Sequence, residues 1–238
     1  MKKIYSILLT SFLFINTQAQ ITFCEDFDSY SNNDPIAQTS SDWNSWDELM
    51  NGSTSPFTDD AAVTNLSSSS GSNSLFFPNN SLAGPEDVLL MFDPMQNITQ
   101  AMLPLLSTPY VAGDFEFSQM MYVRSGGGAY FNFQAENMPG QVWALEVALE
   151  ATGDILMSNT SGTSFACGYP FDQWFEIKFD IDLSNNQWEV FIDGVSQGSF
   201  SNTINQIASL DLYTRAGDEF YVDDICYSYT AATLAQLN

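Results

Sequence analysis

The sequence predicts an all-β protein, built as a two-sheet antiparallel sandwich of the jelly-roll type. Three observations predict it: a complete two-strand hairpin near residues 174–194, many other short strands separated by turn residues, and no long segment with helical periodicity. Regular short strands with this punctuation are typical of sandwiches and jelly rolls, not of parallel α/β sheets.

The hairpin is the clearest single element. Apolar residues alternate with polar or charged ones across Trp174–Leu183 and again across Gln187–Asp193, which is the period of a strand with one buried face. Ser184-Asn185-Asn186 supply the turn between them, and Asp193-Gly194 begins the next tight turn with a dipeptide typical of hairpins.

The same reading along the chain places strands before and after this hairpin. Gly126-Gly127-Gly128, Pro139-Gly140, Gly153-Asp154 and Gly217-Asp218 mark turns between them, whereas the polar segments Asn32–Asp60 and Ser67–Asn73 read as surface loops. Met95–Leu106 is compatible with a short helix before Pro109. The further strands predicted are Ile21–Asp28, Ala61–Leu66, Ser74–Phe77, Asp87–Phe92, Asp114–Val123, Ala129–Ala135, Val142–Glu150, Asp154–Met157, Ile207–Thr214 and Glu219–Tyr229.

The beginning of the chain indicates export. Lys2 and Lys3 precede an apolar run that ends at Ile15, and Thr17-Gln18-Ala19 offers small residues at the positions a signal peptidase reads. We therefore expect residues 1–19 to be a cleaved signal peptide, 20–229 to be one jelly-roll domain and 230–238 to be a short tail. The run is shorter than the roughly 20 residues of a membrane-spanning helix, so we expect no membrane span.

The charge balance limits the partners. Without residues 1–19, Arg124, Lys178 and Arg215 are the basic residues left against 29 acidic ones. Binding to nucleic acid or to an anionic membrane surface needs a basic footprint, so both are excluded. Bound cations would relieve the self-repulsion of such an acidic chain, but simple surface solubility is the preferred explanation of its acidity.

Several motifs occur in the order found in a known group of proteins. They are F-C-E-D-F-D-S-Y at 23–30, S-G-S-N-S-L-F-F at 70–77, the segment 115–134, W-A-L-E-V at 143–147, the hairpin with V-F-I-D-G and F-Y-V-D-D-I-C-Y at 220–227. The chain thereby resembles concanavalin A-like (laminin-G-like) jelly rolls, and in particular secreted proteins of gliding and marine bacteria. Those proteins usually end in a type IX sorting domain. This sequence departs from them, because it ends at Asn238, nine residues past Tyr229, which puts anchoring by that route in doubt.

The resemblance also suggests one catalytic alternative. The sequence has no histidine, which excludes His-based triads and His-ligated zinc and leaves carboxylate chemistry. E-V-A-L-E at 146–150 is similar to the E-x-D-x-E strand of jelly-roll glucanases, which implies Glu146 as nucleophile and Glu150 as acid/base. Ala148 replaces the central Asp that helps to separate the two pKa values, and two solvated glutamates on a polar sheet face remain the alternative.

A binding site is the second kind of function, and the polar faces of the same strands provide its residues. Sugars are recognised by aromatic faces surrounded by amide and carboxylate hydrogen-bonding groups. The alternative is that these side chains only decorate a pleated sheet. The candidate ligand-binding residues are Tyr130, Asn132, Gln134, Trp174, Lys178, Asp211, Tyr213 and Arg215.

Carboxylates also gather at the two ends of the predicted domain. Terminal strands of a jelly roll usually run side by side, so Glu25, Asp26 and Asp28 would meet Asp223 and Asp224. Together they would suit a structural calcium ion, which takes 6–8 oxygen ligands. In the alternative, these carboxylates cap turns and face water.

The cysteine count is odd. Cys24 in the first strand and Cys226 in the last would lie close in antiparallel neighbours, so an exported protein would form a Cys24–Cys226 disulfide and leave Cys167 free. Three reduced, buried cysteines are the alternative.

The sequence as a whole therefore favours an exported, non-catalytic binding module, lectin-like or adhesive, whose partner is an extracellular glycan or cell-surface polysaccharide. The alternatives are a jelly-roll glycoside hydrolase using Glu146 and Glu150, and a structural surface component without a sugar ligand.

Overall fold

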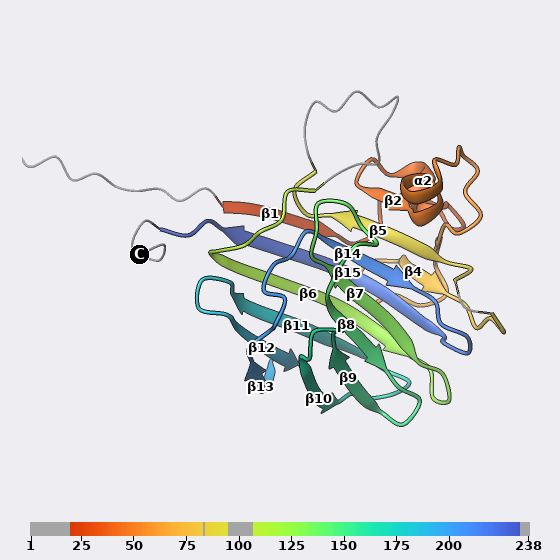
Figure 1. The fold of residues 1–238 in the computed structure, drawn as a ribbon. Helices are drawn as coiled ribbons and strands as arrows, with labels where there is room; N and C mark the ends of the chain where they lie inside the picture. The colour runs from red at the N-terminus through yellow and green to blue at the C-terminus, as the bar shows by residue number, and fades with distance from the viewer. Residues whose placement is uncertain (1–19, 83, 95–106, 234–238) are drawn as a thin grey trace, which may run out of the picture.

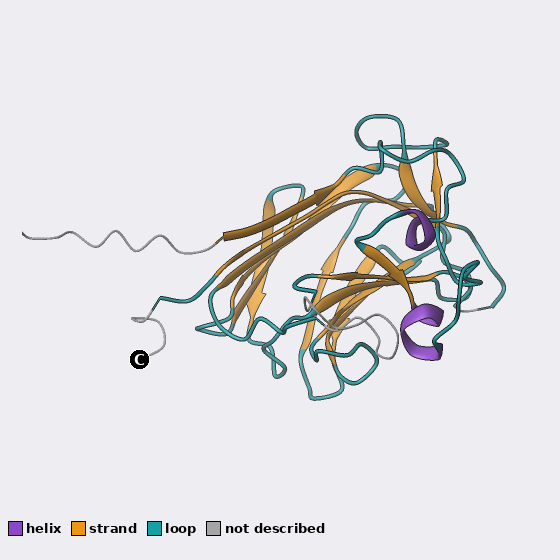
Figure 2. Cartoon of the chain, turned by 90° about the horizontal axis from the view of Figure 1, so that it is seen from above, coloured by secondary structure: helices purple, strands orange, loops and turns teal. Residues whose placement is uncertain are grey.

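A computed structural model describes residues 20–82, 84–94 and 107–233 of the chain. It is an almost entirely β structure in which two antiparallel sheets form two layers (Figure 1). Figure 2 shows the layers from above, with both short helices at the same end of the sandwich. The expected signal peptide, the segment Met95–Leu106 and the last residues of the expected tail lie outside the described residues.

The first sheet has eight strands and includes both ends of the domain. β15 pairs with β6 along one edge, and with β4 and then β1 along the other. In spatial order the strands are β13 (Val195–Phe200), β12 (Gln187–Ile192), β11 (Trp174–Asp182), β6 (Asp114–Val123), β15 (Phe220–Thr230), β4 (Ser74–Phe77) and β3 (Ala62–Thr64), with β1 (Gln20–Glu25) beside β15.

The second sheet has seven strands, and its outer face carries the candidate site. Its order is β10 (Ser164–Gly168), β9 (Asp154–Ser158), β8 (Trp143–Leu149), β7 (Ala129–Gln134), β14 (Ser209–Tyr213), β5 (Asp87–Met91) and β2 (Trp43–Ser45). Two helices precede and follow β2 in the chain, α1 (Ile36–Thr39) and α2 (Trp46–Asn51).

Aromatic side chains fill the space between the sheets. Phe117 of β6 and Phe179 of β11 meet Phe133 of β7, with ring centroids 5.1 and 5.3 Å from that of Phe133. All three are fully buried. Edge-to-face pairs of this kind stabilise a core beyond the area that they bury.

The predicted fold class is confirmed, and the hairpin shows why the prediction works. The alternating apolar residues of β11 and β12, from Phe175 to Ile192, are buried, and their polar neighbours face outward. Asp193 and Gly194 both have positive φ, 48° and 71°, as the tight turn between β12 and β13 requires.

The structure adds elements that the sequence pattern does not reveal. The segment Asn32–Asp60, read as a surface loop, contains α1, β2 and α2. β10 and β13 are edge strands of the two sheets, and β13 is largely exposed, so neither carries the strong apolar alternation of a central strand. The first strand is shorter than predicted, because it ends at Glu25 and Phe27 has a φ of 57°.

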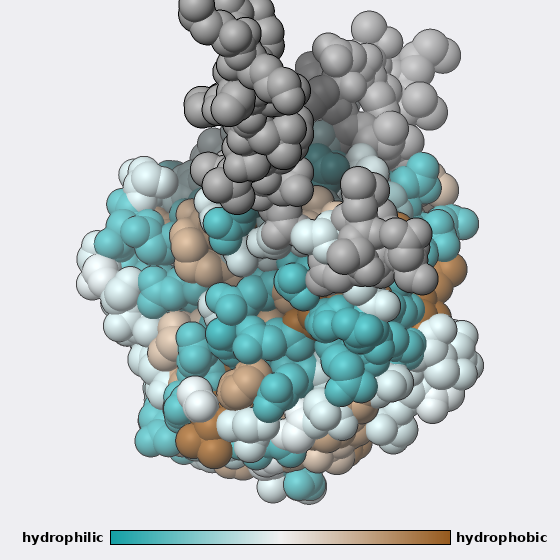
Figure 3. Space-filling view, turned by 90° about the vertical axis from the view of Figure 1, so that its left-hand side faces the viewer, coloured by the Kyte–Doolittle hydropathy of each residue, from teal (hydrophilic) through white to brown (hydrophobic). Residues whose placement is uncertain are grey.

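The two ends of the domain are joined covalently. Cys24 of β1 lies directly opposite Cys226 of β15, and the two form a disulfide across 202 residues of sequence, while Cys167 is free and half-buried. No helix in the described ranges is long and apolar enough to cross a membrane. The side of the molecule in Figure 3 is largely hydrophilic outside its grey atoms, with isolated apolar residues.

Candidate functional site

Polar and aromatic side chains form cross-strand rows on the outer face of the seven-stranded sheet. In one row, Asn132 of β7 lies between Glu146 of β8 and Asp211 of β14. Tyr213 lies opposite Asp87 of β5, two positions along the strand from Asp211, so the two aspartates share this face. The structure thus brings together Tyr130, Asn132, Gln134, Asp211 and Tyr213 of the predicted ligand-binding set.

These rows form the floor of a pocket of about 520 Å³. Helix α2 forms one side, because Leu49 packs on Leu89 and Met91 of β5 while Trp46 reaches the pocket. Gly140 lies against the ring of Trp46 and has a φ of 80°, so a side chain there would collide with the ring. The pocket is lined by Trp46, Asp87, Tyr130, Asn132, Trp143, Glu146, Asp211, Tyr213 and Arg215.

A hydrogen-bond network holds the floor rigid. Asn132 Nδ2 donates to Asp211 Oδ2 at 2.8 Å, and Gln134 Nε2 donates to Asn132 Oδ1 at 2.7 Å and to Asp211 Oδ2 at 3.4 Å. The hydroxyl of Tyr130 donates to Glu146 Oε1 at 3.0 Å. Burial, then the nearby charge of Glu146, raises the pKa of Tyr130, which keeps its hydroxyl a donor. Asn132, Gln134 and Asp211 are almost fully buried, so they orient the floor and present few free atoms.

Asp87 and Asp211 form a carboxyl pair in this floor. Burial raises the pKa of both groups, and the neighbouring carboxylate of Asp211 raises that of Asp87 further. Hydrogen bonds from Asn132, and then from Asp87, oppose the rise at Asp211. At neutral pH the pair therefore holds one proton, carried by Asp87, because two buried carboxylates in contact do not both ionise.

Arg215 lies at the rim, but its guanidinium group is already occupied. It donates to Asp218 at 2.9 Å, to Glu150 at 2.8 Å and to the backbone carbonyl oxygens of Ala129 and Leu149. The group is also 5.7 Å from the centre of the Tyr130 ring. Its role is thus to join the ends of strands β7 and β8 to the loop after β14.

The two glutamates of the catalytic alternative have different surroundings. Glu146 lines the pocket and accepts the Tyr130 hydroxyl, whereas Glu150 is bound to Arg215. Ala148 lies opposite Tyr130, so the position between the two glutamates is next to a tyrosine ring and has no charge of its own. Only one glutamate of the pair therefore lines the pocket.

Trp174 and Lys178 are separated from this pocket, since both lie on the outer face of the eight-stranded sheet. Trp174 donates to Ser67 Oγ at 3.2 Å and lies edge-on to Tyr122. Lys178 forms ion pairs with Glu116 at 2.9 Å and with Asp180 at 3.1 Å. The predicted set of eight residues thus belongs to two opposite surfaces, and these two residues are not part of the pocket.

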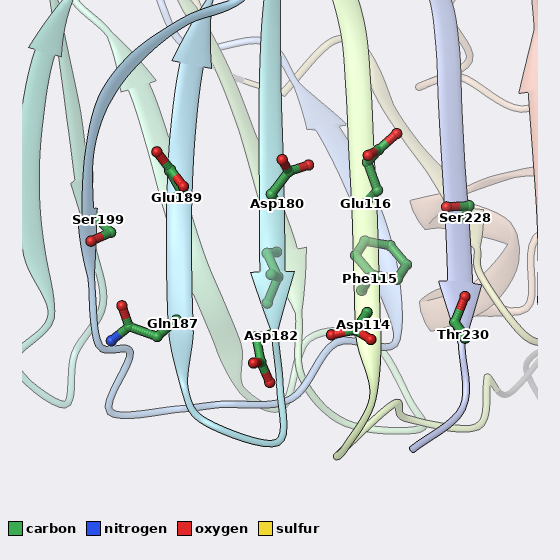
Figure 4. Close-up of a pocket in the computed structure, with 11 residues that line it drawn as sticks. Asp114, Phe115, Glu116, Asp180, Asp182, Gln187, Glu189, Ser199, Ser228 and Thr230 are labelled. Atoms are coloured by element: carbon green, nitrogen blue, oxygen red, sulfur yellow. The ribbon is translucent and has the colours of Figure 1, made fainter. Parts of the chain in front are cut away.

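The same outer face has an acidic hollow of about 430 Å³. Figure 4 shows Glu116, Asp180 and Glu189 side by side on β6, β11 and β12. Glu116 and Asp180 are partly exposed and share Lys178, and Glu189 accepts a hydrogen bond from the Ser196 hydroxyl, as expected of a solvated face.

The predicted calcium ligands hold a loop of the protein. Asp28 Oδ1 accepts hydrogen bonds from the backbone amides of Ser72 and Asn73, and Asp223 Oδ2 accepts those of Ser69 and Ser70. Of the other acids, Glu25 accepts the Phe27 amide, Asp26 the Asp28 amide and Asp224 the Ser70 hydroxyl. In the described part of the chain no three His, Cys, Asp or Glu side chains are grouped as metal ligands would be. The calcium ion stays a prediction.

Three residues that line the pocket were not identified as site residues from the sequence. Trp46 belongs to a helix hidden in a polar segment, and Asp87 is the first residue of a strand whose other residues are apolar. Trp143 lies two residues before Leu145 and four before Val147, which both face the core, so simple alternation would place Trp143 in the core as well. A register irregularity pairs Gln134 with Trp143 and Phe133 with Leu145, which turns the tryptophan toward the pocket.

Comparisons with known proteins bear on the fold. No protein-family model matches the sequence, and a search of curated proteins finds no match to it. The globular domain of Trypanosoma cruzi calreticulin superimposes with a TM-score of 0.55 at 10% identity, covering 90% of this chain and 89% of that one. A sialidase gives 0.51 at 13% identity, and the match covers 85% of this chain but 18% of the sialidase. At these identities the similarity shows the β-sandwich fold alone.

Proposed function

We propose that this chain is an exported, non-catalytic glycan-binding module, lectin-like or adhesive, and that its ligand occupies the pocket on the seven-stranded sheet. The observation that carries the proposal is the composition of that pocket. Aromatic side chains enclose a floor of oriented amide and carboxylate groups, which is the arrangement that recognises sugars.

The aromatic side chains are placed to contact a sugar ring. Tyr130 and Tyr213 are half-buried, with ring centroids 5.9 Å apart, and Trp46 and Trp143 also line the pocket. Each ring is fixed by a strand or helix, so little conformational entropy would be lost on binding. The carboxylate of Glu146 and the carboxyl group of Asp87 supply hydrogen-bonding groups for sugar hydroxyls.

Export is supported by two features. Residues 1–19 have the pattern of a signal peptide, and the Cys24–Cys226 disulfide is of the kind that persists in oxidising compartments. The partner would accordingly be an extracellular or cell-surface polysaccharide.

A screen of the secreted protein on an oligosaccharide array, with and without calcium, tests the proposal. Tyr213→Ala should weaken binding to the best ligand by about 1 kcal/mol, because it removes one aromatic contact. Trp174→Ala is the matched control on the opposite sheet and should leave the affinity unchanged. Absence of any glycan ligand, or equal losses in both variants, would contradict this assignment.

A further inference from the structure

The floor of the pocket contains two carboxyl oxygens that receive no donor except the proton that Asp87 and Asp211 share. Asp211 is only 4% exposed, and its Oδ2 accepts the hydrogen bonds of Asn132 and Gln134. Its Oδ1 atom is buried and receives no hydrogen bond from an N–H group or a hydroxyl among the described residues, and the same holds for Oδ1 of Asp87. Only the proton carried by Asp87 lies between the two carboxyl groups. Buried acceptors without donors are rare in proteins, because each costs free energy.

The surroundings of these two oxygens are negative. Asp47 and Asp59 add negative charge beside Asp87, and Glu146 adds another from β8. The guanidinium of Arg215 is the one cation among the described lining residues, and Glu150 and Asp218 already neutralise it. The other groups that titrate or carry charge near the pair are the phenols of Tyr130 and Tyr213.

This combination disfavours an anionic ligand. A uronic acid or a sulfated sugar would bring a further negative charge to a floor with no available cation. A hydroxyl group of a neutral sugar would donate to one carboxyl group of the pair, and the shared proton would stay with the other. A positively charged group with several N–H donors would interact with both carboxyl groups.

We propose that the pocket selects an amino sugar, whose ammonium group binds at the carboxyl pair of Asp87 and Asp211 and replaces the proton that the pair shares. The inference rests on the proposed glycan-binding function and names its ligand class. The rings of Trp46, Trp143, Tyr130 and Tyr213 suit the same cation, because aromatic faces attract ammonium groups. The proton that the two carboxyl groups share leaves to solvent, so one proton is released for each ammonium bound.

Titration calorimetry with three oligosaccharides of equal length tests this selection. The probes are a glucosamine oligomer, its fully N-acetylated counterpart and an oligogalacturonate, at pH 6 and about 0.3 M sodium chloride, where attraction to the acidic surface as a whole is screened. Buffers of different ionisation enthalpy report the protons exchanged. We expect the glucosamine oligomer to bind at least tenfold more tightly than the acetylated one, the galacturonate to be weakest, and about one proton to be released.

Two variants place the effect at the carboxyl pair. Asp211→Asn and Asp87→Asn should each remove most of the preference for the amine, and Asp87→Asn should abolish the proton release. Asp114→Asn, an exposed position on the opposite sheet, is the control and should retain both. Melting curves check that each variant is folded.

The outcomes separate this inference from the function on which it rests. Equal or tighter binding of the acetylated oligomer overturns the selection of an amine and leaves glycan binding intact. A preference that persists in both pocket variants also overturns it, because the acidic surface would then be its source. Absence of binding by all three probes overturns the glycan-binding function together with the inference.

Discussion

Replacing Asp87 with asparagine should make the protein more stable, by an amount that grows with pH. Asp87 is held protonated in the folded protein by burial and by the neighbouring carboxylate of Asp211. In the unfolded chain an aspartate ionises near pH 3.9. Folding at neutral pH therefore takes up one proton. A group with a raised pKa in the folded state contributes most to stability below its unfolded pKa, and that contribution falls as pH rises.

The size of the effect follows from this proton. Each pH unit above the unfolded pKa costs about 1.4 kcal/mol, so at pH 7 the uptake costs at most about 4 kcal/mol, and at pH 5 about 1.5 kcal/mol. An asparagine side chain has nearly the same shape and donates to Asp211 Oδ1 without taking up a proton. The variant therefore does not lose the free energy that proton uptake costs the unmodified protein.

Urea unfolding at pH 5, 6, 7 and 8, followed by fluorescence of the buried Trp43 and Trp188, measures the difference. The gap between Asp87→Asn and the unmodified protein should widen by about 1.4 kcal/mol per pH unit. Asp114→Asn removes a charge from an exposed position and should show no such slope. Parallel pH profiles for the Asp87 variant and the unmodified protein would refute the shared proton.

The disulfide, the expected calcium site and the catalytic alternative each give a further prediction. The unfolded, unreduced protein should titrate one thiol, that of Cys167, and reduction should lower the free energy of unfolding by up to about 5 kcal/mol; three thiols would contradict the bond. If calcium binds among the carboxylates at the joined ends of the domain, chelation should lower the melting temperature, whereas identical curves in chelator and millimolar calcium would remove the ion. No reducing sugar should be released from laminarin, lichenan, agarose or carrageenan, and turnover abolished by Glu146→Gln would establish the hydrolase instead.

Much of the fold was predictable because alternation of apolar and polar residues decides which face of a strand is buried. In β7, Phe131 and Phe133 identify the buried face of the strand, and alternation then correctly places Tyr130 on the opposite face. The same reasoning identifies the buried face of β14, and that of β8 beyond the irregularity at its start.

The composition of the pocket was only partly predictable, because it depends on which strands become neighbours. Alternation places Trp174 and Tyr130 each on an outer face, but it does not say that the two faces belong to different sheets. The contribution of Trp46 needs the packing of α2 over Leu89 and Met91, and that of Asp87 needs β5 beside β14. Both are contacts between segments distant in sequence, which no local period encodes.

The acidity of the chain also explains why Asp87 and Asp211 are stabilised differently from the other acidic residues. Elsewhere the structure stabilises carboxylates by two means that are absent at this pair: backbone amides hold Asp28 and Asp223, and a guanidinium group holds Glu150 and Asp218. Even so, burial raises the pKa of Asp223 to about 6.

With few basic residues in the chain, neither means is applied at Asp87 and at Oδ1 of Asp211, where one proton takes the place of a donor. A proton is the weakest of these arrangements at neutral pH, since it is the one that the solvent can remove. The unmatched oxygens lie in the pocket lined with aromatic rings. A ligand that brings its own positive N–H donors would stabilise the folded protein at the position where the protein itself provides least.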